Sequence, residues 1–65
     1  MPNIILSLTI EIRRVEALMP GLENEQAMKA QRALNKARRS LESNILELMM
    51  EATDDLNEIW PEIKK

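Results

Sequence analysis

The sequence contains no cysteine and no histidine, and each absence excludes a class of site. Without cysteine, the chain has neither disulfides nor thiolate metal ligands. Without histidine, it lacks the commonest general base and the usual zinc ligand sets. Gly21 is the only glycine, so no glycine-rich phosphate loop is present, and no serine or threonine has a recognisable activating neighbour. We therefore expect a protein without enzymatic activity, metal or cofactor.

Aromatic residues and turn-forming residues are also scarce. Trp60 is the only aromatic residue, and three prolines accompany the single glycine. The core must therefore be aliphatic, and few turns are available, which favours helices over a sheet. A chain of 65 residues forms one domain at most and buries too little surface to be comfortably stable alone. We expect an all-α domain that compensates by self-association or by unusually good helix packing.

The charge and hydropathy patterns indicate neither secretion nor membrane insertion. The net charge is −2. The apolar stretch from Ile4 to Ile12 is interrupted by polar residues, follows no basic residue, and is too short to span a bilayer. We expect a cytoplasmic protein with no membrane partner.

Pro20-Gly21 breaks helical geometry and places a loop at about 19–23. One helix is predicted before this loop and one after it. The first helix covers about 4–18. After the loop, Asn24 is a plausible N-cap, and apolar residues then recur every three or four positions as far as Ile59. This pattern predicts one long helix over about 24–60, ended by Pro61, with a short tail at 61–65. A bend near Ser40–Asn44 or Thr53–Asp55 stays open, because residues that compete for backbone hydrogen bonds are bunched there.

Residues 4–13 fit two patterns. Leu6, Leu8, Ile10 and Ile12 alternate with polar residues, as in a strand. A strand followed by two helices would suggest a ribbon-helix-helix repressor, but the roughly six residues between Arg14 and Pro20 are too few for a helix. Steps of three and four through Leu8, Ile12 and Val15 favour a helix.

The unequal helix lengths predict a homo-oligomer. At 1.5 Å per residue, the first helix spans about 22 Å and reaches only about Leu41 of the second. The uncovered apolar ridge is then the expected oligomer interface, formed by Ile45, Leu48, Met49, Ala52, Leu56, Ile59 and Trp60. We predict a helical hairpin that associates into a homo-oligomeric four-helix bundle, most simply a homodimer.

Charge is divided between the halves of the long helix. Between Gln26 and Leu41 every charge is positive, and between Glu42 and Glu62 every charge is negative. Antiparallel long helices would place each basic half beside an acidic half of the partner.

The basic half is also a candidate anion site. The residues concerned are Arg13, Arg14, Lys29, Arg32, Lys36, Arg38 and Arg39. Arg38 falls beside the apolar stripe and therefore needs a partner, which Glu11 or Glu16 could supply. Our first functional hypothesis is a non-enzymatic adaptor, regulator or inhibitor that binds itself and another protein. The alternative is an anion-binding module for a nucleotide or nucleic acid.

Overall fold

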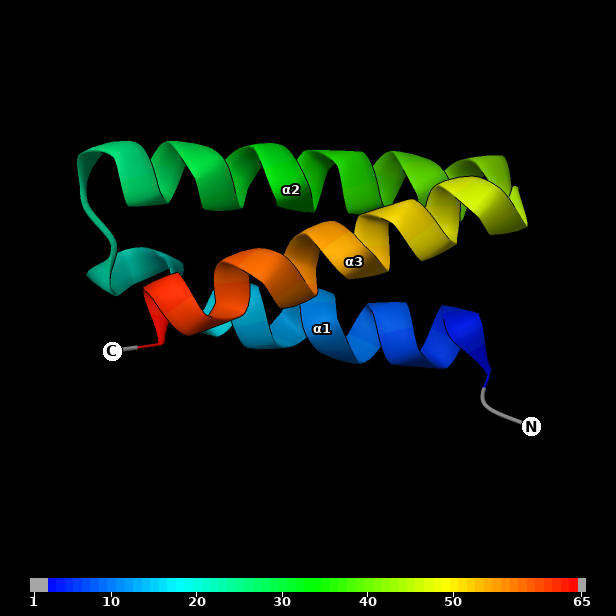
Figure 1. Cartoon of the computed structure of the whole chain (residues 1–65), viewed down its shortest axis with the longest axis horizontal. Coiled ribbons are helices and arrows are strands. Elements are labelled where there is room, and N and C mark those ends of the chain that lie inside the picture. The colour runs from blue at the N-terminus through cyan, green and yellow to red at the C-terminus, as the bar shows by residue number, and fades with distance from the viewer. Residues whose placement is uncertain (1–2, 65) are drawn as a thin grey trace.

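The computed structural model describes residues 3–64, and this part of the chain forms three α-helices and no strand. Helix α1 spans Ile4–Leu18, α2 spans Asn24–Ser43 and α3 spans Leu46–Ile63, with a short 3-10 turn, η1, at Met19–Gly21. The chain runs along α1, returns along α2 and reverses again into α3, so that α1 and α3 begin at the same end (Figure 1). The all-α prediction is confirmed.

Helix α1 begins at a side-chain cap. The Asn3 Oδ1 atom accepts hydrogen bonds from the backbone N–H groups of Ile5, at 3.0 Å, and Leu6, at 3.4 Å. These two donors have no partner within the helix, so the cap stabilises its first turn. Residues 4–13, in which apolar and polar residues alternate, are thus helical. Leu8 and Ile12 then point into the core, and Leu6 and Ile10, two positions away from them, lie on the outer face.

The loop at 19–23 contains η1 followed by two extended residues. Pro20 lies in the first turn of η1, where its missing N–H group removes no helical hydrogen bond. The predicted N-cap at Asn24 is wrong: Asn24 is the first residue of α2, and Glu23 takes the cap position without a side-chain hydrogen bond. The carbonyl of Glu23 accepts the first backbone bonds of the helix, from Gln26 and Ala27.

The predicted single helix over 24–60 is wrong, because the chain reverses at Asn44 and Ile45. Asn44 adopts the left-handed conformation, with φ 57° and ψ 30°, and Ile45 is extended. The N–H group of Asn44 donates to the Ser40 carbonyl, which satisfies one of the last carbonyls of α2. Asn44 is the last residue of Ser40–Asn44, one of the two segments where the sequence left a bend open. The structure is therefore a three-helix bundle within one chain, where we expected a two-helix hairpin.

The predicted end of the last helix at Trp60 is also wrong. Helix α3 continues through Pro61 to Ile63, and Lys64 takes the C-cap position, so the expected tail at 61–65 is helical as far as Ile63. Lys65 lies outside the described residues. Pro61 has no N–H group to donate to the carbonyl four residues earlier, so the helix loses one backbone hydrogen bond at this position. Ile63 is 5% exposed, so its burial in the core favours the extra turn.

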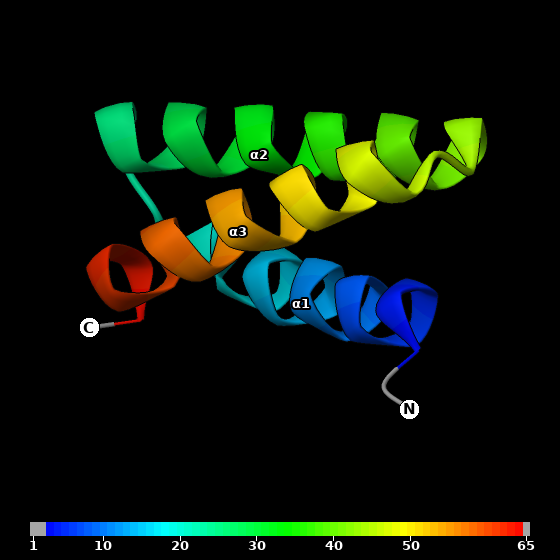
Figure 2. The same cartoon turned by 45° about the vertical axis from the view of Figure 1, so that its right-hand side comes forward.

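Helix α3 crosses between the other two helices and packs against both (Figures 1 and 2). Leu8, Leu34 and Leu56, one from each helix, are almost fully buried. Small residues allow the helix backbones to approach closely around them. The buried alanines are Ala30, Ala33 and Ala37 of α2 and Ala52 of α3. Reversal of the chain thus provides a core that the predicted hairpin would have lacked.

Candidate interaction surface

Among residues 3–64, seven of the eight exposed large apolar residues belong to the segments that meet at the end of the bundle where α1 and α3 begin. We call this surface the apolar end; it consists of Ile5, Leu6, Ile10, Ile45, Leu46, Leu48 and Met50. The eighth, Met28, lies near the start of α2, at the opposite end. A cluster of this kind on a small domain is typical of a surface that binds a protein.

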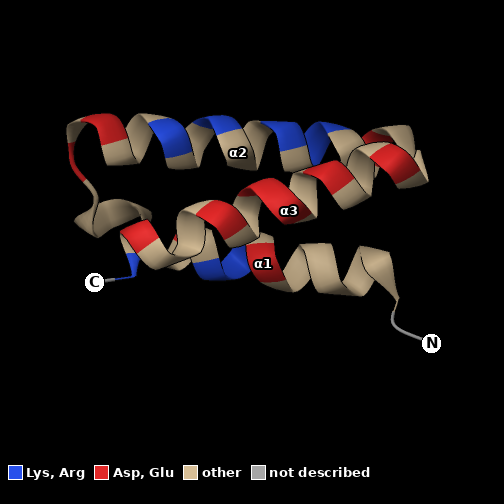
Figure 3. Cartoon of the chain, in the orientation of Figure 1, with Lys and Arg blue, Asp and Glu red and all other residues tan. Residues whose placement is uncertain are grey.

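Helix α1 contributes to the apolar end because it carries apolar residues on two faces. Leu8, Ile12 and Val15 fill the inner face, and Leu6 and Ile10 are 59% and 48% exposed on the outer face. No charged residue precedes Glu11 in the sequence, and Figure 3 shows the first half of α1 free of charge. Solvent-facing positions of a helix are normally polar, so this outer face is unusual for a surface that remains in water.

The turn between α2 and α3 contributes the other part of the apolar end. Ile45 and Leu46 are about half exposed, at 50% and 56%, and Leu48 is 39% exposed. Near this turn, Lys36, Arg39, Ser40, Ser43 and Leu48 line a hollow of about 300 Å³. The hollow carries two cations and two hydroxyls beside one apolar side chain, so it does not continue the apolar end as a purely apolar groove.

The residues expected at an oligomer interface divide into two groups. Met49, Ala52 and Leu56 are buried in the core of their own chain, and Ile59 and Trp60 are half-buried against it. Ile45 and Leu48 remain exposed. The predicted apolar ridge is therefore mostly covered by its own chain. Of the residues predicted at the interface, only Ile45 and Leu48, nearest the turn, are exposed.

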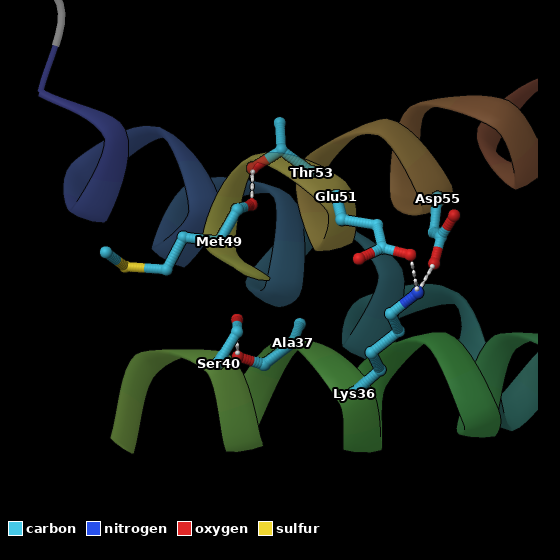
Figure 4. Close-up of polar contacts among 7 residues, drawn as sticks. All are labelled: Lys36, Ala37, Ser40, Met49, Glu51, Thr53 and Asp55. Atoms are coloured by element: carbon cyan, nitrogen blue, oxygen red, sulfur yellow. Dashed lines mark hydrogen bonds and ion pairs between the residues drawn. The ribbon is translucent and has the colours of Figure 1, made fainter. Parts of the chain in front are cut away.

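Basic residues of α2 lie beside acidic residues of α3 in antiparallel order (Figure 3). Lys36 Nζ lies 2.8 Å from Asp55 Oδ2 and 3.1 Å from Glu51 Oε1 (Figure 4). Lys29 Nζ lies 4.0 Å from Glu62 Oε2 at the other end of α2. The complementary arrangement that we expected between two chains is thus formed within one.

Hydrogen bonds from Lys36 Nζ to Asp55 and Glu51 raise the pKa of Lys36 above its usual value of 10.5. The two carboxylates favour the charged ammonium, and this outweighs the opposing effect of desolvation. All three side chains are at least one-third exposed. Their effect on stability is therefore modest, and their main role is to align α2 with α3.

Two predicted anion-site residues have ion-pair partners on α1. Arg38 forms an ion pair with Glu16, which was one of the two partners expected from the sequence. Arg14 Nη1 lies 3.0 Å from Glu11 Oε1, and the Arg14 guanidinium also covers the Trp60 ring. The second carboxylate oxygen of Glu11 is buried without a hydrogen-bond partner within residues 3–64.

The structure does not bring the predicted basic residues together as one open anion site. Lys29, Arg32 and Lys36 line a hollow of about 250 Å³, but Asp55 and Glu58 line the same hollow. Arg39 lines the separate hollow near the turn, and Arg38 is paired with α1. Arg13 and Arg14 belong to α1. An incoming phosphate would therefore meet carboxylates in the first hollow, which weakens electrostatic attraction.

Two further features bear on possible sites. Among residues 3–64, no group of three acidic side chains converges as a metal site would require. Each helix within residues 3–64 is too short or too polar to span a bilayer.

No protein-family model, curated protein or solved structure matches this chain.

Proposed function

We propose that this protein is a non-enzymatic interaction protein that associates with a second copy of itself through the apolar end. The observation that carries this proposal is that the core is already complete, yet seven large apolar side chains remain exposed at one end. The assembled form then acts as a small adaptor, regulator or inhibitor toward another macromolecule.

A second copy is the occupant that best suits the apolar end. The outer face of α1 lacks charge up to Glu11, so two such faces approach each other without repulsion. A chain of 65 residues also has much to gain from extra apolar burial. Each large side chain transferred from water contributes about 1.5–3 kcal/mol.

Anion binding receives less support as a function. Lys36, Arg38 and Arg14 already have carboxylate partners at ion-pair distance, and Asp55 and Glu58 flank the hollow lined by Arg32. A phosphate ligand would have to displace or tolerate these carboxylates. We therefore place self-association ahead of nucleotide or nucleic-acid binding.

The test compares two exposed apolar positions at opposite ends of the bundle. Leu6→Glu and Met28→Glu each add one charge at a residue that is 59% or 57% exposed. Light scattering across micromolar concentrations should show a wild-type dimer, and Leu6→Glu should raise its dissociation constant by about 10- to 100-fold. Met28→Glu should leave the dimer intact. A wild-type protein that stays monomeric throughout would contradict the proposal.

A further inference from the structure

The turn between α2 and α3 depends on one residue in a conformation that side chains seldom adopt. Only Asn44 and Ile45 separate the two helices, and neither is glycine or proline. Asn44 has φ 57°, in the left-handed region, which asparagine tolerates better than most residues but less well than glycine. The two helices are thus joined by a residue that can also continue a helix.

The sequence on both sides of this turn is compatible with an unbroken helix. From Glu25 to Ile59 there is no proline or glycine, and the apolar spacing of threes and fours continues through Leu41, Ile45 and Leu48. If Asn44 and Ile45 adopted right-handed helical dihedrals, α2 and α3 would join. The backbone groups now satisfied by the turn would then form ordinary helical hydrogen bonds.

Opening the turn would remove α3 from its own core, but a second copy could restore every lost contact. The pairs Lys36–Glu51 and Lys29–Glu62 join antiparallel helices and are placed almost symmetrically about the turn in the sequence. Two extended chains lying antiparallel, with Asn44 and Ile45 at their crossing point, could form the same pairs between chains. The acidic α3 of one copy then lies beside the basic α2 of the other.

The exposed side chains at the turn provide a reason for exchange to be favourable. In the exchanged arrangement, each bundle consists of α1 and α2 from one copy and α3 from the other. The two bundles meet at the ends where the turns were, so their apolar ends face each other. Ile45, Leu46 and Leu48, now 39–56% exposed, would lie at this junction. Closed monomers avoid the entropy lost on association, so exchange depends on protein concentration.

We propose that the second copy is bound by exchange of α3, with Asn44 as the hinge that converts closed monomers into an antiparallel dimer with continuous long helices. This inference rests on the self-association proposed above and specifies how it occurs. Short hinges that hold an unfavourable conformation are the usual setting for such exchange.

Two matched pairs of substitutions test the hinge. Asn44→Gly relieves the left-handed conformation and should favour the monomer, whereas Asn44→Ala disfavours it and should strengthen the dimer by about tenfold at each of its two hinges. Leu46→Pro suits the first position of α3 but blocks a continuous helix, so it should yield a folded monomer. Leu46→Ala removes the same apolar side chain without blocking a continuous helix, so it should weaken the dimer far less than Leu46→Pro does.

A distance measurement distinguishes exchange from docking of closed copies. Spin labels at Lys29→Cys and Glu62→Cys, in labelled chains refolded with excess unlabelled protein, report the distance within one chain. In the exchanged dimer, positions 29 and 62 of one chain should lie about 50 Å apart, at 1.5 Å per residue. In the closed Leu46→Pro monomer they should lie beside each other, as Lys29 and Glu62 do in the structure. A wild-type dimer with a short distance would overturn exchange while leaving self-association standing. If wild type and Asn44→Ala both remained monomeric with a short distance, both proposals would fall.

Discussion

The guanidinium carbon of Arg14 lies 4.1 Å from the centre of the Trp60 ring, which joins α1 to α3 by a cation–π contact. The sequence assigned these residues to two different surfaces, Arg14 to an anion site and Trp60 to an oligomer interface. In the folded chain they contact each other, and Arg14 also pairs with Glu11. The contact therefore occupies residues from both predicted surfaces without a second molecule.

The Arg14–Trp60 contact should stabilise the bundle by about 0.5–1 kcal/mol, the usual contribution of a partly exposed cation–π pair. A double-mutant cycle with Arg14→Met and Trp60→Leu, followed by circular dichroism during urea unfolding, isolates this coupling. The single substitution Arg14→Met should lower the unfolding free energy by more than this coupling, because Glu11 then loses its ion-pair partner. A coupling free energy near zero would show that the two side chains are neighbours without attraction.

The raised pKa of Lys36 predicts a loss of stability in strongly alkaline solution. A lysine whose folded pKa exceeds its unfolded value contributes its full stabilisation below about pH 10.5, and this is lost as the pH rises through the folded pKa. The difference in unfolding free energy between wild type and Lys36→Met should thus be constant near neutral pH and shrink above pH 10.5. Urea unfolding at pH 8 and pH 11 measures it. In an Asp55→Asn, Glu51→Gln background, Lys36→Met should show no such pH dependence.

Leu56 and Leu48 both lie on the ridge predicted from the sequence, but only Leu56 is inside the core. Leu56 is 0% exposed and Leu48 is 39% exposed. Leu56→Ala should therefore lower the unfolding free energy by about 2–5 kcal/mol, enough to unfold much of a small domain. Leu48→Ala should lower it by less than about 1 kcal/mol at concentrations where the protein is monomeric. Equal losses for the two variants would contradict the folding of α3 onto its own chain.

Gly21 should be replaceable by alanine with a gain in stability. Gly21 does not use a positive φ, and a Cβ atom built there meets no atom within 4 Å. Alanine would restrict the unfolded chain without straining the folded one, so Gly21→Ala should raise the unfolding free energy by about 0.4–1 kcal/mol. Thermal and urea unfolding measure this gain. A loss of stability would indicate that η1 requires the freedom of glycine.

The sequence by itself determined the local features. The scarcity of turn residues and the three- and four-residue spacing fixed an all-helical chain, and Pro20-Gly21 fixed the loop after α1. The partner of Arg38 was predictable as one of two residues, Glu11 or Glu16, because a charge beside an apolar stripe needs a nearby opposite charge; Glu16 supplies it. The antiparallel matching of basic and acidic halves was also predictable. These features depend on the periodicity of apolar residues or on the order of charges, and both can be determined from the sequence.

Only the tertiary structure decided that the chain reverses at Asn44. The conformational preference of one asparagine amounts to about 1 kcal/mol, which is too small to show in the pattern of apolar residues. Burial of Met49, Ala52 and Leu56 against α1 and α2 contributes several times more. The apolar stripe keeps its helical phase through the turn, so the same residues suit a long helix and a folded-back one. Packing, which depends on all three helices together, makes that choice.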